Sequence, residues 1–119
     1  MLAATAAAVL ATASPALAAP KTNLTLSYQS DAGYAAAAKL RCGPLGGGHP
    51  QGKQACAALK RVGGRPGLLR APPDVMCTME YAPVTARMTG TWKGTKVSWS
   101  QRFGNQCDLT RTTGALYAF

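Results

Sequence analysis

Residues 81–103, YAPVTARMTGTWKGTKVSWSQRF, carry the clearest folding signal in this chain. Both halves contain Val, Thr and Trp, residue types that fit the surface of a sheet. Between them, Trp92-Lys93-Gly94-Thr95 has the glycine that a tight turn needs. The stretch therefore predicts two antiparallel strands, residues 81–92 and 95–103, joined by a short hairpin turn.

More of the sheet is predicted on either side of this hairpin. Residues 22–29, TNLTLSYQ, place Leu24, Leu26 and Tyr28 on one face, which is the period of a half-buried strand. The final residues 115–119, ALYAF, predict a closing strand. Residues 34–42, YAAAAKLRC, fit a strand or a helix by pattern, and the sequence leaves both open.

One segment predicts a helix. In KQACAALKRV, residues 53–62, Ala55, Leu59 and Val62 recur at helical spacing, and Gly63 follows as a C-terminal stop. GPLGGGHPQGK and GGRPGLLRAPPD, which flank this segment, predict loops because their glycines and prolines sustain neither helix nor strand. The sum is an antiparallel sheet with one or two helices, an α+β domain.

The first 19 residues, MLAATAAAVLATASPALAA, contain no charge and end near Ala16-Leu17-Ala18, the small-x-small pattern of a signal-peptidase site. The usual basic start is absent, since Lys21 is the first basic residue. We expect residues 1–19 to be a secretion signal, cleaved near Ala18 or Ala19, and residues 20–119 to be one extracellular domain. The alternative is a buried alanine-rich helix; a membrane span is not expected, because the segment is too short and too weakly apolar.

The cysteines Cys42, Cys56, Cys77 and Cys107 are an even number in a chain expected to be exported, so two disulfides are predicted. Three pairings are possible and sequence alone does not separate them; we favour Cys42 with Cys56 and Cys77 with Cys107. Each bridge would stabilise so small a domain by about 3 kcal/mol. A metal site is not expected, because no C-x-x-C occurs and His49 is the only histidine.

The net charge of +9 lies entirely after position 20. The 13 basic residues are scattered, with no run longer than two and no aromatic platform for stacking bases. We therefore expect a solvated basic surface that speeds encounters with acidic partners, and no nucleic-acid or membrane partner.

Catalytic chemistry is hard to place in this sequence. His49 lies in a glycine-rich loop beside Pro50 with no triad motif around it. GGHPQGKQ imitates a phosphate-binding loop, but Gln54 replaces the required Ser or Thr. With only four acidic residues, a carboxylate pair is not expected either. We expect no enzyme and no cofactor.

The segment DVMCTMEYAPV, residues 74–84, has two interpretations. Its period suits an amphipathic strand with Cys77, Met79 and Tyr81 on the core face. The prolines on both sides and the cysteine inside suit instead an exposed, extended segment held rigid, which is the shape that a protease accepts as an added strand.

Several motifs together resemble the Streptomyces subtilisin inhibitor family. They are GGGHP leading to ACAAL, VGG, VMCTMEY with PV two residues on, GTWKGTKVSWSQRFGNQC and the terminal ALYAF. The resemblance runs from about Leu24 to Phe119 and keeps all four cysteines in order. It implies a five-stranded antiparallel sheet with two short helices, the two disulfides favoured above, and a homodimer formed through the sheet face.

The resemblance also implies a secreted inhibitor of subtilisin-like serine proteases. At matching positions the reactive bond joins Met79 to Glu80, and Met79 enters the primary specificity pocket of the protease. Met76 fills a second pocket, while Thr78 and Tyr81 flank the bond. This chain departs from the family twice, since proline is common where Thr78 stands and an apolar residue where Glu80 stands.

Two alternatives remain open at this point. The first is a broader inhibitor that also acts on chymotrypsin-like proteases or metalloproteases, as some relatives do. The second is a non-inhibitory module that binds a partner through its positive charge.

Overall fold

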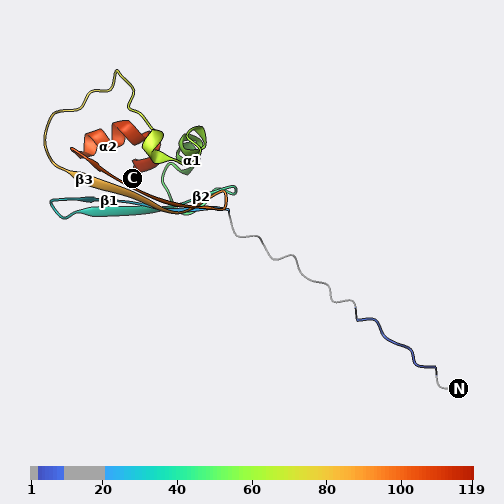
Figure 1. Ribbon diagram of the computed structural model, residues 1–119. Helices are drawn as coiled ribbons and strands as arrows, with labels where there is room; N and C mark the ends of the chain where they lie inside the picture. Colours follow the sequence, from blue (N-terminus) through green and yellow to red (C-terminus); the bar gives the residue numbers. More distant parts are fainter. Residues whose placement is uncertain (1–2, 10–20) are drawn as a thin grey trace.

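The computed structural model describes residues 3–9 and 21–119, and residues 21–119 form an α+β domain (Figure 1). The predicted cleavage site near Ala18 or Ala19 lies outside the described residues. The elements in chain order are β1 (Thr22–Ser30), β2 (Ala35–Cys42), α1 (Gly52–Arg61), η1 (Pro66–Leu68), β3 (Val84–Trp92), β4 (Thr95–Phe103), α2 (Gln106–Thr113) and η2 (Gly114–Tyr117), where η marks a 3₁₀ helix.

The four strands form one antiparallel sheet in the order β2-β1-β3-β4. The ambiguous residues 34–42 supply strand β2, in which Leu40 lies opposite Leu24 and is fully buried. Short turns join β1 to β2 and β3 to β4. The long crossing from β2 to β3 holds α1, η1 and an irregular segment, and Figure 1 shows both helices on the same side of the sheet.

The prediction of five strands is wrong: the described residues contain four. The expected closing strand at 115–119 is instead the 3₁₀ helix η2 and the two residues after it. Leu116 and Tyr117 are both buried. Successive residues of a strand point to opposite faces, so a one-sided sheet could not bury this pair, whereas a helical turn between two layers can.

The hairpin is confirmed, with one correction at its start. Lys93 and Gly94 form the turn with φ values of 47° and 84°, and two positive φ values in a row match the twist of the flanking strands. β3 begins at Val84, however, and not at residue 81. Pro83 has no N–H to give to a strand partner, and the Ala82 N–H donates to the carbonyl of Gly104 instead, at 2.8 Å.

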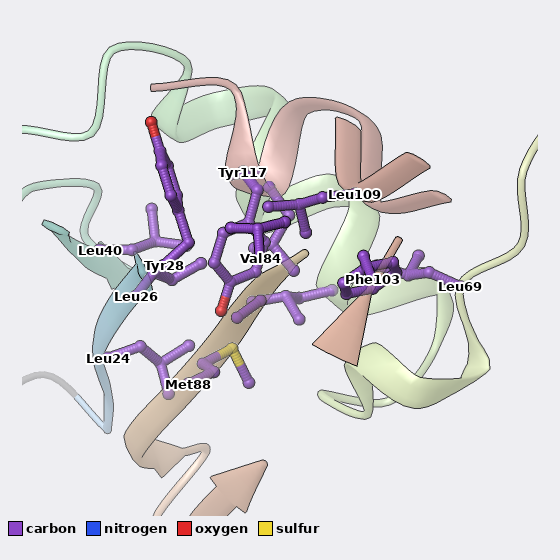
Figure 2. Close-up of a cluster of buried hydrophobic side chains, with 14 of the residues drawn as sticks. Leu24, Leu26, Tyr28, Leu40, Leu69, Val84, Met88, Phe103, Leu109 and Tyr117 are labelled. Carbon is purple, nitrogen blue, oxygen red and sulfur yellow. The ribbon is translucent and has the colours of Figure 1, made fainter. Parts of the chain in front are cut away.

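The core lies between the inner face of the sheet and the helices. Leu24 and Leu26 from β1 meet Met88 from β3, with Leu109 of α2 and Tyr117 of η2 above them (Figure 2). Burial of this apolar surface is the main stabilising term of the fold. The alternation seen in TNLTLSYQ is therefore confirmed as the inward face of a strand.

Both helices have identifiable ends. α1 is the predicted helix and buries Ala55, Ala58 and Leu59; it ends ahead of Gly63, whose φ of 61° suits glycine. The sequence did not place α2, whose N-cap is Asn105.

The two favoured disulfides are confirmed. Cys42 joins Cys56 and Cys77 joins Cys107, with Cα–Cα distances of 5.9 and 5.8 Å. The first ties β2 to α1, and the second ties the irregular segment before β3 to α2. Within residues 3–9 and 21–119, no helix is both long and apolar enough to cross a membrane.

Candidate functional site: the exposed loop

Residues 70–83, called here the exposed loop, connect η1 to β3 without a helix or strand. Figure 1 shows this segment arching out from the domain before it enters the sheet. The loop contains all the residues that the sequence assigned to the reactive bond and its flanks.

The exposed loop turns apolar side chains toward solvent. Met79 is 99% exposed, Met76 is 83% exposed and Tyr81 is 79% exposed. The interpretation of this segment as an amphipathic strand with Met79 and Tyr81 facing the core is therefore wrong. Large exposed apolar groups gathered on one segment are typical of an interaction site.

The backbone of the loop is held although its side chains are free. The Asn105 amide nitrogen Nδ2 donates to the Thr78 carbonyl at 3.1 Å and to the Glu80 carbonyl at 2.8 Å. These two residues flank Met79, so a single side chain fixes the main chain on both sides of it. The disulfide at Cys77, the residue directly before Thr78, adds a covalent anchor.

Asn105 is itself held by the fold. Its Oδ1 accepts a hydrogen bond from the Asp108 N–H at 2.8 Å, which caps α2. One amide thus caps a helix with its oxygen and supports the loop with its nitrogen. Asn105 is not among the site residues predicted from the sequence. The signal available was the pattern Asn-x-x-Asp at 105–108, which is typical of a helix start, but nothing local reveals that the amide nitrogen reaches residues 78 and 80.

Further contacts fix both ends of the loop. After the Met79 region, the Ala82 N–H donates to Gly104 and the Pro83 carbonyl accepts from the Asp31 N–H at 3.0 Å. Before it, the Val75 N–H donates to the Pro72 carbonyl at 3.2 Å, and Arg111 donates to the Val75 carbonyl at 3.4 Å. The loop is therefore tied to the turn after β1, to α2 and to the residue that follows β4.

An ion pair stands beside the second half of the loop. Arg102 of β4 donates to both carboxylate oxygens of Asp31, at 2.6 and 3.1 Å. Hydrogen bonding to Asp31 first, and then to the Tyr81 side chain, raises the pKa of Arg102 above its ordinary value. Since both partners of the ion pair are about half exposed, the pair adds little to the stability of the fold.

His49 has a structural position. Its Nε2 lies 2.9 Å from the Leu116 carbonyl, and its Nδ1 accepts from the Gln51 N–H at 2.9 Å, so the neutral ring donates through Nε2. The ring is buried and meets Phe119 edge-on. It joins the glycine-rich loop to η2 and is not placed to act as a base. Among the described residues, no three His, Cys, Asp or Glu side chains gather where a metal ion could bind.

These features define a small disulfide-bonded binding protein that presents one rigid, solvent-exposed loop. Comparison with known proteins then identifies its family: a family model described as subtilisin inhibitor-like matches residues 18–105, and the chain belongs to this family. The family consists of inhibitors, so the protein is not an enzyme, and the resemblance noted in the sequence is confirmed.

Individual relatives agree with this assignment. The chain is 43% identical over 98 residues to subtilisin inhibitor-like protein 1 of Streptomyces cacaoi, covering 80% of this chain and 89% of that one. It is 44% identical over 102 residues to subtilisin inhibitor-like protein 12 of Streptomyces hygroscopicus, covering 81% and 92%. Among solved structures, Streptomyces caespitosus sermetstatin in complex with Bacillus licheniformis subtilisin is similar with a TM-score of 0.70 and 26% identity, covering 82% and 97%.

Proposed function

We propose that this protein is a secreted inhibitor of subtilisin-like serine proteases and that Met79–Glu80 is its reactive bond. The observation that carries the proposal is the Asn105 amide, which holds the carbonyls of Thr78 and Glu80 while the Met79 side chain stays 99% exposed. A fixed main chain with a free apolar side chain is what a substrate-like inhibitor needs. The related sermetstatin, solved bound to a subtilisin, supports the choice of partner.

Binding would follow the way in which a protease holds an extended substrate. The loop adds as a strand, and alternate side chains fill pockets. Met79 is flexible and apolar and would enter the primary pocket, while Met76 would fill a second one. Thr78 and Tyr81 would contact the protease beside the bond. Because the loop backbone is already held in one shape, binding avoids much of the cost of ordering the main chain, about 1–2 kcal/mol for each residue.

The mechanism would be reversible cleavage. The protease serine attacks the Met79 carbonyl carbon, the bond to the Glu80 nitrogen breaks, and that nitrogen leaves as an amine with the proton that the protease histidine returns to it. In an ordinary substrate the amine then diffuses away and water enters. Here the Glu80 carbonyl is held by Asn105, and the next residues are held by Gly104 and β3. The amine stays near the acyl carbon, so the bond can form again before water reacts.

The two departures from the family pattern would tune affinity without changing the mode of binding. Glu80 is exposed and places a negative charge directly after the bond. We expect this charge to weaken binding to proteases whose matching pocket is apolar or acidic. Thr78 keeps the backbone N–H that a proline would lack.

Titration of subtilisin with the oxidised protein tests this proposal. We expect activity to fall linearly to zero near one equivalent of inhibitor. Met79→Lys should move inhibition from subtilisin toward a protease with a basic-residue preference, because Met79 sets specificity. Leu68→Lys is a matched control, since Leu68 is also an exposed apolar residue, 53% exposed, but lies outside the loop. A Met79→Lys protein with unchanged preference would remove Met79 from this role.

Secretion is part of the same proposal. We propose that residues 1–19 direct export and are removed near Ala18 or Ala19. Expression of the whole chain in a secreting host, followed by N-terminal sequencing of the protein in the medium, should give a mature start at Ala19 or Pro20. Retention of the intact chain inside the cells would contradict the proposal.

A homodimer is implied by the resemblance, with the sheet face as its contact. In this chain the sheet face that points away from the helices is hydrophilic and carries several basic side chains. Two such faces repel each other, so we propose a weak dimer that strengthens as salt screens the charge. Sedimentation at low and high salt would test this, and a tight dimer at low salt would contradict it.

A further inference from the structure

Helix α2 contacts the main chain of the exposed loop at two separate places, and Figure 1 shows the helix beneath the arch of the loop. Asn105, the N-cap of the helix, holds the carbonyls of Thr78 and Glu80. Arg111, in the last turn of the same helix, reaches a third carbonyl of the loop, that of Val75. This third contact lies before the reactive bond and has no role in the mechanism of cleavage and religation.

The guanidinium of Arg111 is divided between two partners. Its Nε donates to Asp108 Oδ1 at 2.9 Å, and its Nη2 lies 2.9 Å from the same oxygen. The remaining branch, Nη1, donates to the Val75 carbonyl at 3.4 Å. The side chains of this ion pair are 33% and 32% exposed, so the pair is less open to solvent than that of Arg102 with Asp31. Because the guanidinium is planar and rigid, the ion pair directs Nη1 to the loop.

The fold holds Asp108 in turn. Its N–H donates to Asn105 Oδ1 at 2.8 Å, and its carboxylate stands in the first turn of α2, where the helix dipole favours a negative charge. Arg111 stands in the last turn, where the dipole favours a positive charge. A spacing of three residues places Asn105, Asp108 and Arg111 along one side of the helix. These three residues therefore form one chain of contacts from the reactive bond to Val75.

Met76 is the residue whose backbone this chain of contacts fixes. It follows Val75 directly, so the carbonyl that Arg111 holds belongs to the peptide group of the Met76 N–H. The disulfide at Cys77 holds the main chain on the other side of Met76. The Met76 side chain itself is 83% exposed. The arrangement at Met79, a held backbone with a free apolar side chain, is thus repeated three residues earlier.

We propose that Arg111 is a positioning residue that holds Met76 in place for the second pocket of the protease, an inference that rests on the inhibitory function proposed for the loop. Arg111 acts through the Val75 carbonyl and not by contact with the protease. Without this hydrogen bond the main chain before Met76 gains freedom, and binding has to order it again, which weakens inhibition. Lysine cannot replace arginine here, because a single ammonium does not hold Asp108 and Val75 together in a fixed geometry.

The test is a double-mutant cycle on the inhibition of subtilisin by the oxidised, folded protein. Arg111→Met removes the donors but keeps an apolar chain, and its effect is measured both with Met76 present and in Met76→Ala protein. With Met76 present, we expect the inhibition constant to rise about 3–10-fold. In Met76→Ala protein we expect a rise of less than about twofold, because no long side chain is left to position.

Two further variants separate positioning from charge and stability. Arg61→Met is the matched control, since Arg61 is also an exposed basic residue in the last turn of a helix. It should change inhibition by less than about twofold with or without Met76. Arg111→Lys keeps a charge that can pair with Asp108 but loses the branch that reaches Val75. We expect its denaturant midpoint to match that of the unaltered protein, while its inhibition constant rises as for Arg111→Met.

Two outcomes would overturn this inference alone. Equal losses with and without the Met76 side chain would mean that Arg111 acts on the whole fold or contacts the protease itself. Full inhibition by both Arg111 variants would mean that the Val75 contact does not matter. In either case the unaltered protein still inhibits subtilisin, so the function proposed for the loop stands. Absence of inhibition by the unaltered protein would instead contradict that function, and this inference with it.

Discussion

Two irregular segments of this protein, residues 43–51 and the exposed loop 70–83, differ in which of their side chains they bury. Both contain prolines; the first follows directly on the disulfide cysteine Cys42, and the second contains the disulfide cysteine Cys77. The first buries its polar His49, which is 8% exposed, and the second exposes its apolar Met79, which is 99% exposed. The usual distribution of polar and apolar side chains is therefore reversed in both.

The reversal has a physical explanation in each case. His49 is buried because both ring nitrogens reach main-chain partners, which removes the penalty of burying a polar group. Met79 remains exposed because the Asn105 amide and the disulfide hold the backbone without help from side-chain burial. The first segment is thus part of the folded core, and the second is arranged for a partner.

Removing each disulfide in turn should give the largest difference between the segment that belongs to the core and the loop that binds a partner. Cys77→Ala/Cys107→Ala opens a loop with a sequence separation of 30, and Cys42→Ala/Cys56→Ala one of 14. Loop closure gives each a similar loss of stability, about 3–4 kcal/mol. We expect the first variant to be cut rapidly by subtilisin, while the second, where folded, still inhibits it. Denaturant unfolding and inhibition assays check both parts. Equal inhibition by the two folded variants would contradict the distinction.

Substitution of the buried histidine should damage stability alone. His49→Ala leaves the Leu116 carbonyl and the Gln51 N–H without their partner and opens a cavity beside Phe119. We expect a loss of roughly 2–4 kcal/mol in the free energy of unfolding. Inhibition by the folded fraction should not change. A selective loss of inhibition would show that this segment also contacts the protease.

Substitution of Asn105 should weaken inhibition and leave the stability of the fold nearly unchanged. Asn105→Asp keeps an oxygen to accept from the Asp108 N–H but loses the amide that donates to Thr78 and Glu80. We expect the free energy of unfolding to stay within about 1 kcal/mol and inhibition to weaken by about 1–3 kcal/mol, roughly 5–150-fold. Asn105→Ala, the control, should lose stability as well. Full inhibition by Asn105→Asp would refute the role given to the amide.

The core that holds residues 43–51 should also respond to alkaline pH. Burial raises the pKa of Tyr117 above its ordinary value of 10.0. Above pH 10 the unfolded chain therefore releases the phenol proton while the folded chain keeps it, so stability falls as pH rises, by up to about 1.4 kcal/mol per pH unit. Below pH 10 this group has no effect. Unfolding curves from pH 9 to 11.5 should fall less steeply for Tyr117→Phe than for the control Tyr34→Phe. Identical slopes would contradict the assignment.

The regular parts of the fold could be predicted from the sequence because their signals are local. Three local patterns each predicted a single structure, and all three were confirmed. They are the alternation at Leu24, Leu26 and Tyr28, the turn at Lys93 and Gly94, and the helical spacing at Leu59. The family resemblance and both disulfide pairs were also confirmed.

The errors came where distant contacts decide the structure. ALYAF has strand residues, but η2 forms because Leu116 and Tyr117 both pack inward between helix and sheet. The support of Met79 by Asn105 joins residues about 26 positions apart, a contact that no local pattern encodes. The reactive bond itself, with Met76, Thr78, Tyr81 and the secretion signal, stays a prediction.

The most direct measurement is the fate of the Met79–Glu80 bond in the presence of a catalytic amount of subtilisin. Mass spectrometry should locate a single slow cut after Met79, and protein cut there in advance should partly return to the intact chain under the same conditions. Such an equilibrium is expected if Asn105 and the Cys77–Cys107 bridge keep the new ends together. Cleavage at another bond, or cleavage that proceeds to fragments without religation, would contradict the mechanism proposed for this loop.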